Sequence, residues 1–124
     1  MNKQKGMKIL LATDGSAHSI AAVKEVANRT FPPKTRVRII SVIDKVALTR
    51  YTGPLGVLNE YHAEVDHNAL KLAEDANEYA AKILHEKNPM LSVTTAVIDG
   101  SPISVILKEA ETFGADLIVV GSHG

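Results

Sequence analysis

Apolar residues follow two different patterns along this chain, and the two patterns alternate. The first and last apolar runs, 7–12 and 116–120, are nearly continuous, which is typical of strands buried on both faces of a parallel sheet. Two further strands are expected over 35–43 and 91–98. The run at 91–98 contains a serine and two threonines, a polarity that indicates a strand at the edge of the sheet.

Between the strands, apolar residues recur at helical spacing. Helices are expected over three ranges: 17–29, 59–88 and 102–113. Ser16 and Ser101 are predicted N-caps, and Gly114 is a predicted C-cap. The segment 44–58 shows neither the helical nor the strand spacing of apolar residues and contains two glycines, so we expect a mobile loop there.

The helical stripes predict which side chains the two later helices bury. For the second helix these are Val65, Ala69, Leu72, Ala76, Tyr79, Ala80 and Ile83. For the third helix they are Ile103, Ile106, Leu107 and Ala110.

The predicted succession of elements, βαβαβαβ, indicates an open, doubly wound α/β fold with a parallel sheet and right-handed crossovers. With the continuous runs in the middle and the polar run at an edge, the expected strand order is 3-2-1-4. The first two helices should then cover one face of the sheet, and the third helix the other. We expect one domain over 1–124.

This strand order places a topological switch point between the first and fourth strands, where open α/β sheets bind ligands. Two loops meet there: 12–14, which contains Asp14, and 121–124, which contains Gly121 and Gly124. A carboxylate accepts hydrogen bonds from ribose hydroxyls, and glycines let backbone N–H groups approach phosphates. Each signal alone is weak, because an aspartate after a strand more often forms a turn than binds a ligand, and glycine pairs occur in many loops by chance. The coincidence of both at the switch point therefore carries the prediction of a nucleotide site.

The amino-acid composition limits the classes of binding partner and the cellular compartment that we expect. Lys plus Arg and Asp plus Glu number 14 each, which argues against nucleic-acid or membrane-surface binding, although a local basic patch is compatible with it. The chain has no cysteine, which excludes disulfides and thiolate chemistry and is compatible with a reducing compartment. No segment approaches the ~18 apolar residues of a membrane span, so we expect a cytoplasmic protein.

Four segments resemble landmarks of the universal stress protein family: Ile9–Ser16, Ser41–Asp44, Asp99–Pro102 and Ala115–Gly124. In ATP-binding members of that family, the loop after the fourth strand reads Gly-x2-Gly-x9-Gly-(Ser/Thr). Gly121 and Gly124 match the first two glycines, and the sequence stops before the rest of the motif. The resemblance implies a further helix and a fifth strand beyond Gly124, so we expect the domain to be incomplete at its C-terminus.

The resemblance also implies roles for individual residues. Asp14 would contact the ribose, and Ala12, Thr13 and Val42 would line the adenine or ribose pocket. The phosphate loop and its start would be Val120, Gly121, Ser122, His123 and Gly124. The implied cofactor is ATP, with or without Mg²⁺, and the implied assembly is a homodimer.

Two functions are open. The first is an ATP-binding regulatory protein of the stress response that is not an enzyme, because the chain has no Gly-x-x-x-x-Gly-Lys-(Ser/Thr) loop and no evident magnesium carboxylates. Slow ATP hydrolysis is the remaining enzymatic alternative. The second is a family member that binds no nucleotide and acts as a dimeric protein-interaction module. A phospho-acceptor receiver domain shares the layers but needs an acidic pair after the first strand, which Asp14 alone does not supply.

Other polar clusters favour structural roles. The helical spacing of His62, Asp66 and His67 could hold a metal, but no further ligand is evident, so we interpret them as a solvated helix face. His18 and Ser19 lie in the first turn of the first helix, near the expected phosphates. We interpret both as helix-surface residues.

Overall fold

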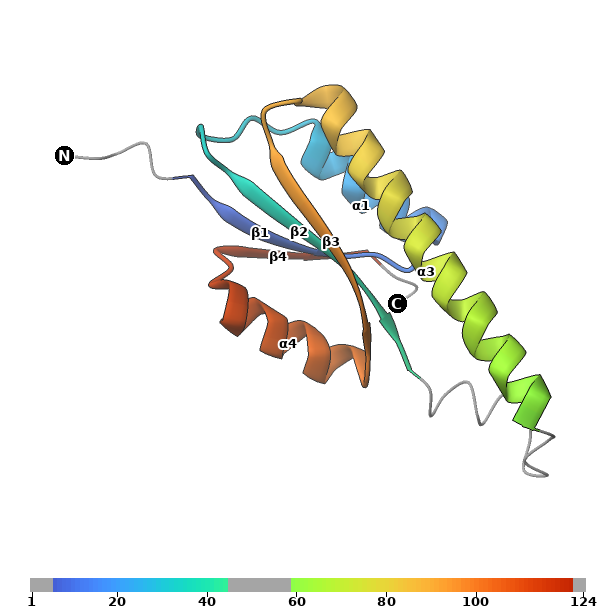
Figure 1. The fold of residues 1–124 in the computed structure, drawn as a ribbon. Helices are drawn as coiled ribbons and strands as arrows, with labels where there is room; N and C mark the ends of the chain where they lie inside the picture. Colours follow the sequence, from blue (N-terminus) through green and yellow to red (C-terminus); the bar gives the residue numbers. More distant parts are fainter. Residues whose placement is uncertain (1–5, 45–58, 122–124) are drawn as a thin grey trace.

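The computed structural model describes residues 6–44 and 59–121, and in the second helix the side chains from residue 67 onward. Its elements in chain order are β1 Lys8–Ala12, α1 Ala17–Ala27, β2 Arg36–Ile43, α3 Asn59–Lys87, β3 Ser92–Asp99, α4 Pro102–Phe113 and β4 Leu117–Val120 (Figure 1). Each predicted element is present, with ends within two residues of the prediction. The loop expected over 44–58 lies, apart from Asp44, outside the described residues.

The helix ends follow from their capping residues. The side chain of Ser16 accepts a hydrogen bond from the Ser19 N–H at 3.2 Å and caps α1. Gly114 ends α4 in the left-handed conformation, with φ 73°. Ser101 occupies the N-cap position of α4, but its side chain makes no capping hydrogen bond, contrary to the expected hydroxyl cap. Pro102 starts this helix instead through its fixed φ angle.

The described strands form one parallel sheet in the order β3-β2-β1-β4, as predicted. β1 lies in the middle, so Ala12 is in register with Ile40 of β2 and with Val120 of β4. The chain leaves β1 toward β2 and returns through α4 to the other side of β1 (Figure 1). The predicted switch point between β1 and β4 is therefore confirmed.

Alternation along β1 divides the core into two layers. Ile9 and Leu11 pack on one face of the sheet with residues of α1 and α3. Leu10 and Ala12 pack on the opposite face against α4. Because successive side chains of a strand point to opposite faces, one short apolar strand supplies both layers. This confirms the predicted distribution of helices, two on one face and one on the other (Figure 1).

The apolar stripe of α3 is less buried than the sequence predicts. Leu72 and Tyr79 are 70% and 48% exposed, although both belong to the predicted buried stripe. From residue 67 onward, the buried positions of this helix are Asn77, Ala80 and Leu84, whereas the side chain of Val65 lies outside the described residues. The helix packs on β2, β3 and α1 along that line, and Leu72 and Tyr79 border surface cavities instead.

The prediction for α4 is also wrong in part. Ile103 and Leu107 are 74% and 61% exposed, whereas Ile106 and Ala110 are half-buried against the core. The helix packs mainly on β1 and β2. Part of its apolar stripe therefore has no element to pack against within residues 6–44 and 59–121.

Candidate nucleotide-binding site

The carboxyl ends of the central strands meet at the turn that follows β1. The Thr13 N–H continues the β1–β2 ladder by donating to the Ile40 carbonyl at 3.0 Å. On the other side, Val120 is the register partner of Ala12. The predicted residues Ala12, Thr13 and Val120 thus lie on neighbouring strand ends, although the side chain of Ala12 packs into the core on the α4 side.

A cavity of about 320 Å³ opens at the carboxyl ends of β1 and β2, next to α3. Its lining residues are Thr13, Asp14, Ser41, Val42, Ile43, Asp44, Ala69, Leu72 and Ala73. Three of the predicted site residues, Thr13, Asp14 and Val42, therefore line one cavity. Ser122, His123 and Gly124 lie outside the described residues.

Asp14 is exposed and belongs to the lining of this cavity. Its Oδ1 accepts a hydrogen bond from the Ser16 N–H at 2.9 Å, which closes an Asx-type turn. Partial burial alone raises the pKa of this carboxyl, but hydrogen bonds from Ser16 and Ser19 outweigh it and set the pKa below its ordinary value. Asp14 is therefore an anion at neutral pH, and both its turn-forming and its ligand-binding interpretations fit the geometry.

Thr13 is held at each of its polar atoms. Besides its backbone N–H bond, its hydroxyl donates to Ser19 Oγ at 3.0 Å and accepts from the Gly15 N–H at 3.3 Å. Its carbonyl accepts from the Ser41 hydroxyl at 2.9 Å. Ser19 is fully buried, so its interpretation as a helix-surface residue was wrong. Its hydroxyl anchors the turn instead, a role that depends on how α1 folds back onto β1.

Gly121, the last described residue, packs tightly against α1. A Cβ atom there would lie 2.6 Å from the His18 carbonyl oxygen and 2.8 Å from the Cα of Ser19. Because real Cβ atoms do not approach backbone atoms this closely, glycine is needed here for packing as well as for any phosphate contact. The segment after β4 therefore starts beside the first turn of α1.

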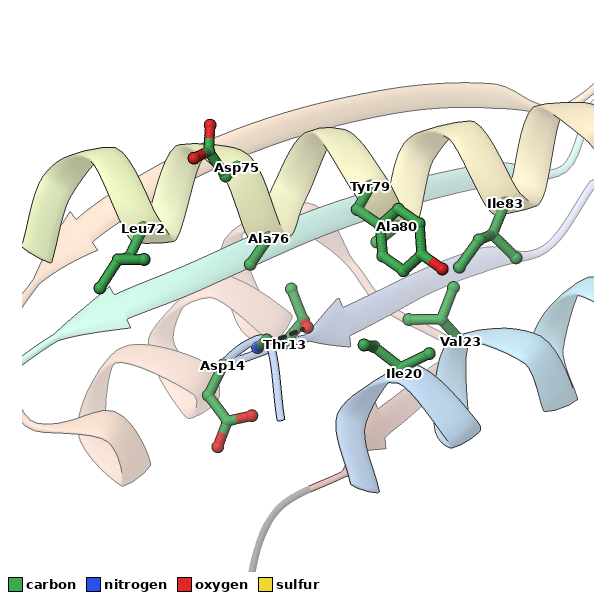
Figure 2. Close-up of a pocket in the computed structure, with 11 residues that line it drawn as sticks. Thr13, Asp14, Ile20, Val23, Leu72, Asp75, Ala76, Tyr79, Ala80 and Ile83 are labelled. Carbon is green, nitrogen blue, oxygen red and sulfur yellow. Dashed lines mark hydrogen bonds between the residues drawn. The ribbon is translucent and has the colours of Figure 1, made fainter. Parts of the chain in front are cut away.

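A second cavity, also of about 320 Å³, lies between α1 and α3 and was not predicted from the sequence. Figure 2 shows Ile20 and Val23 of α1 facing Tyr79 and Ile83 of α3 across it. Its wall shares Thr13, Asp14 and Leu72 with the first cavity. The Asp14 carboxylate points away from α3 in this view (Figure 2).

The described residues contain neither a candidate metal site nor a candidate membrane-spanning helix. No group of three or more histidine, cysteine or acidic side chains there could hold a metal ion. His67 is exposed, whereas the side chains of His62 and Asp66 lie outside the described set. None of the described helices is long and apolar enough to cross a membrane.

Comparison with known proteins shows which family the chain belongs to. The sequence profile described as the universal stress protein family matches residues 7–124. The chain is 32% identical over 123 residues to the universal stress protein YxiE of Bacillus subtilis, covering 94% of this chain and 79% of that protein. It is also 32% identical over 124 residues to the universal stress protein MJ0577 of Methanocaldococcus jannaschii, covering 94% of this chain and 76% of that protein.

Solved structures share the fold. The structure of MJ0577 superposes with a TM-score of 0.75 at 28% identity, covering 95% of this chain and 76% of that one. A universal stress protein solved in complex with cAMP superposes with a TM-score of 0.56 at 14% identity, covering 91% of this chain and 70% of that one.

The four-stranded parallel sheet, with α1 and α3 on one face and α4 on the other, defines a doubly wound α/β protein. Within that class, the matched profile and the two relatives place the chain in the universal stress protein family.

Proposed function

We propose that this protein binds an adenine nucleotide, ATP, at the carboxyl ends of β1, β2 and β4, and acts as a regulatory protein of the stress response. The observation that carries this proposal is the meeting of Thr13, Asp14 and Val42 in one cavity at the carboxyl ends of β1 and β2, next to the switch point between β1 and β4. A universal stress protein of the same fold was solved with cAMP, itself an adenine nucleotide. The fold therefore accommodates ligands of this class.

The cavity offers one apolar and one ionic contact for a nucleoside. Val42 lines the cavity while packing partly against the core on the α4 side, and Leu72 of α3 adds apolar surface suited to a flat base. The Asp14 carboxylate is exposed and ionised, so it can accept hydrogen bonds from the ribose hydroxyls. In this proposal Thr13 does not bind through its hydroxyl, because that group is already bonded to Ser19 and Gly15.

The phosphates would lie toward Gly121 and the segment that follows it. Gly121 contacts the first turn of α1, where the helix dipole favours negative charge. The first turn of α1 contains no acidic residue that would oppose an anion. Val120, Gly121, Ser122, His123 and Gly124 are the proposed phosphate loop and its start.

We propose binding without turnover. The chain lacks the Gly-x-x-x-x-Gly-Lys-(Ser/Thr) loop that positions phosphates in the P-loop hydrolases. Any Mg²⁺ would enter with the triphosphate, because the described residues include no cluster that could hold the ion alone. A cytoplasmic location belongs to the same proposal, since ATP and a chain without cysteine both fit a reducing compartment.

The second candidate function is a dimeric protein-interaction module without nucleotide. It is favoured by exposed apolar side chains on α4 and β4: Ile103, Leu107, Ile118 and Val120. The two functions differ in whether nucleotide is bound, and a homodimer is part of both.

Calorimetric titration of the purified protein with ATP tests the first proposal. We expect saturable binding that GTP does not match, together with adenine nucleotide released from the freshly purified protein on denaturation. Absence of both signals would favour the interaction module. Incubation with ATP and Mg²⁺, followed by chromatography of the nucleotide, tests turnover, and we expect no ADP above the protein-free control.

A further inference from the structure

A buried hydroxyl connects the proposed nucleotide turn to the middle of α3. Ser41 Oγ lies 2.9 Å from the Thr13 carbonyl oxygen and 2.7 Å from Asn77 Oδ1. Ser41, Thr13 and Asn77 are each at least 95% buried. A third acceptor, the Ala73 carbonyl, lies farther away at 3.4 Å. The single hydroxyl hydrogen of Ser41 thus serves the Asn77 and Thr13 oxygens as its two nearest acceptors.

Asn77 fixes the direction of this contact. Its Nδ2 donates to the Ala96 carbonyl of β3 at 2.9 Å, so its Oδ1 faces Ser41. The opposite amide orientation would place two oxygens together at Ala96. The side chain of Asn77 therefore ties α3 to β3 and β2, and Ser41 extends the connection to the end of β1.

We propose that Ser41, oriented by Asn77, is a positioning residue that holds the Thr13–Asp14 turn in the geometry that binds the nucleotide. This inference rests on the proposed function. Ser41 lines the same cavity as Asp14, but its hydroxyl hydrogen is directed to protein acceptors. Its contribution therefore passes through Thr13, whose carbonyl it holds, to the neighbouring carboxylate.

The opposite end of β2 provides a matched control. Thr35 directly precedes the strand, and it is 2% exposed. Its hydroxyl donates to the Pro32 carbonyl at 2.6 Å and accepts from the Met7 N–H at 3.2 Å. Thr35→Val thus removes a buried, doubly bonded hydroxyl as Ser41→Ala does, but at the amino end of the sheet, away from the cavity.

The first readout is ATP affinity, measured by calorimetry in the full chain. We expect Ser41→Ala to weaken ATP binding about tenfold, equivalent to about 1.4 kcal/mol, and Thr35→Val to change it less than about twofold. Denaturant midpoints should fall for both variants, since each leaves buried partners unpaired. Ser41→Thr keeps the hydroxyl and should retain the wild-type affinity. Equal weakening by Ser41→Ala and Thr35→Val would reduce Ser41 to a stability role.

The second readout needs no ligand. Amide hydrogen exchange of Gly15 and Ser16, which bond to Thr13 and Asp14, should accelerate in Ser41→Ala and remain unchanged in Thr35→Val. Wild-type exchange rates at both amides in Ser41→Ala would overturn the inference. If the wild-type protein binds no ATP, the proposed function fails while the exchange rates still decide whether Ser41 positions the turn.

Discussion

The backbone of Gly121 lies so close to Ser19 that a Cβ atom on the glycine would stand 2.8 Å from the Ser19 Cα. Ser19 in turn is fully buried and bonds the Thr13 hydroxyl at 3.0 Å. One helical turn therefore contacts both segments that converge at the switch point. The spacing between the Asp14 turn and the start of the glycine loop depends on this contact.

Gly121→Ala should destabilise the protein by about 1–3 kcal/mol, because the added methyl meets the backbone of α1, which cannot move without disturbing the helix. Urea unfolding measures the change. Ile118→Ala, in the same strand but 41% exposed, is the control and should cost less. Wild-type stability of Gly121→Ala would show that the strand end is free to shift.

Asp14→Ala should weaken ATP binding by roughly 1.5–3 kcal/mol, the usual effect of losing a charge-assisted hydrogen bond. Asp116 offers a matched control. It is also an exposed aspartate whose carboxylate accepts one backbone N–H, from Lys8 at 2.8 Å, but it lies at the amino end of the sheet. Calorimetry on Asp14→Ala and Asp116→Ala should show a loss for the first alone. Equal affinities would remove Asp14 from the site.

The pH dependence of stability provides a separate test of the Asp14 turn. Its pKa is lower in the folded protein than the ordinary value of about 3.9, so the ionised form is favoured by folding. Its contribution is present above about pH 4 and disappears as the pH falls through the folded-state pKa. Asp14→Asn should therefore be less stable than the wild type at pH 6, and the difference should shrink as the pH falls below about 4 in urea titrations. A constant difference across that range would contradict the assigned hydrogen bonds.

The fold was predictable because its signals are local. The continuous apolar runs at 7–12 and 116–120 identified the central strands, and the polar run at 91–98 identified the edge. Burial on the helices was predicted less well. Leu72 and Leu107 fit a helical stripe, but their exposure depends on which neighbouring element covers them. Sequence periodicity contains no information about that neighbour.

The candidate site was only partly predictable, for a similar reason. The switch-point rule and the family resemblance pointed to Asp14 and Val42, which line one cavity. The Ser41–Asn77 contact joins residues 36 positions apart. Ser41 belongs to a segment that resembles the family, but nothing in the sequence pairs it with Asn77. The packing role of Gly121 became visible only from the position of α1. Contacts between elements, unlike periods within them, require the folded geometry.

The last prediction concerns the surface formed by α4 and β4. Its exposed apolar side chains are Ile103, Leu107, Ile118 and Val120. Within the described residues, β4 pairs with β1 alone and is an edge of the sheet, a combination that favours association with another copy. We expect a dimer or larger species of these 124 residues in light scattering, and the double variant Leu107→Glu, Ile118→Lys should shift it toward monomer. Leu70→Glu places a charge at a leucine on α3 that is 40% exposed, so it should leave association unchanged. A monodisperse wild-type monomer, or equal dissociation by the α3 control, would show that this surface does not drive assembly.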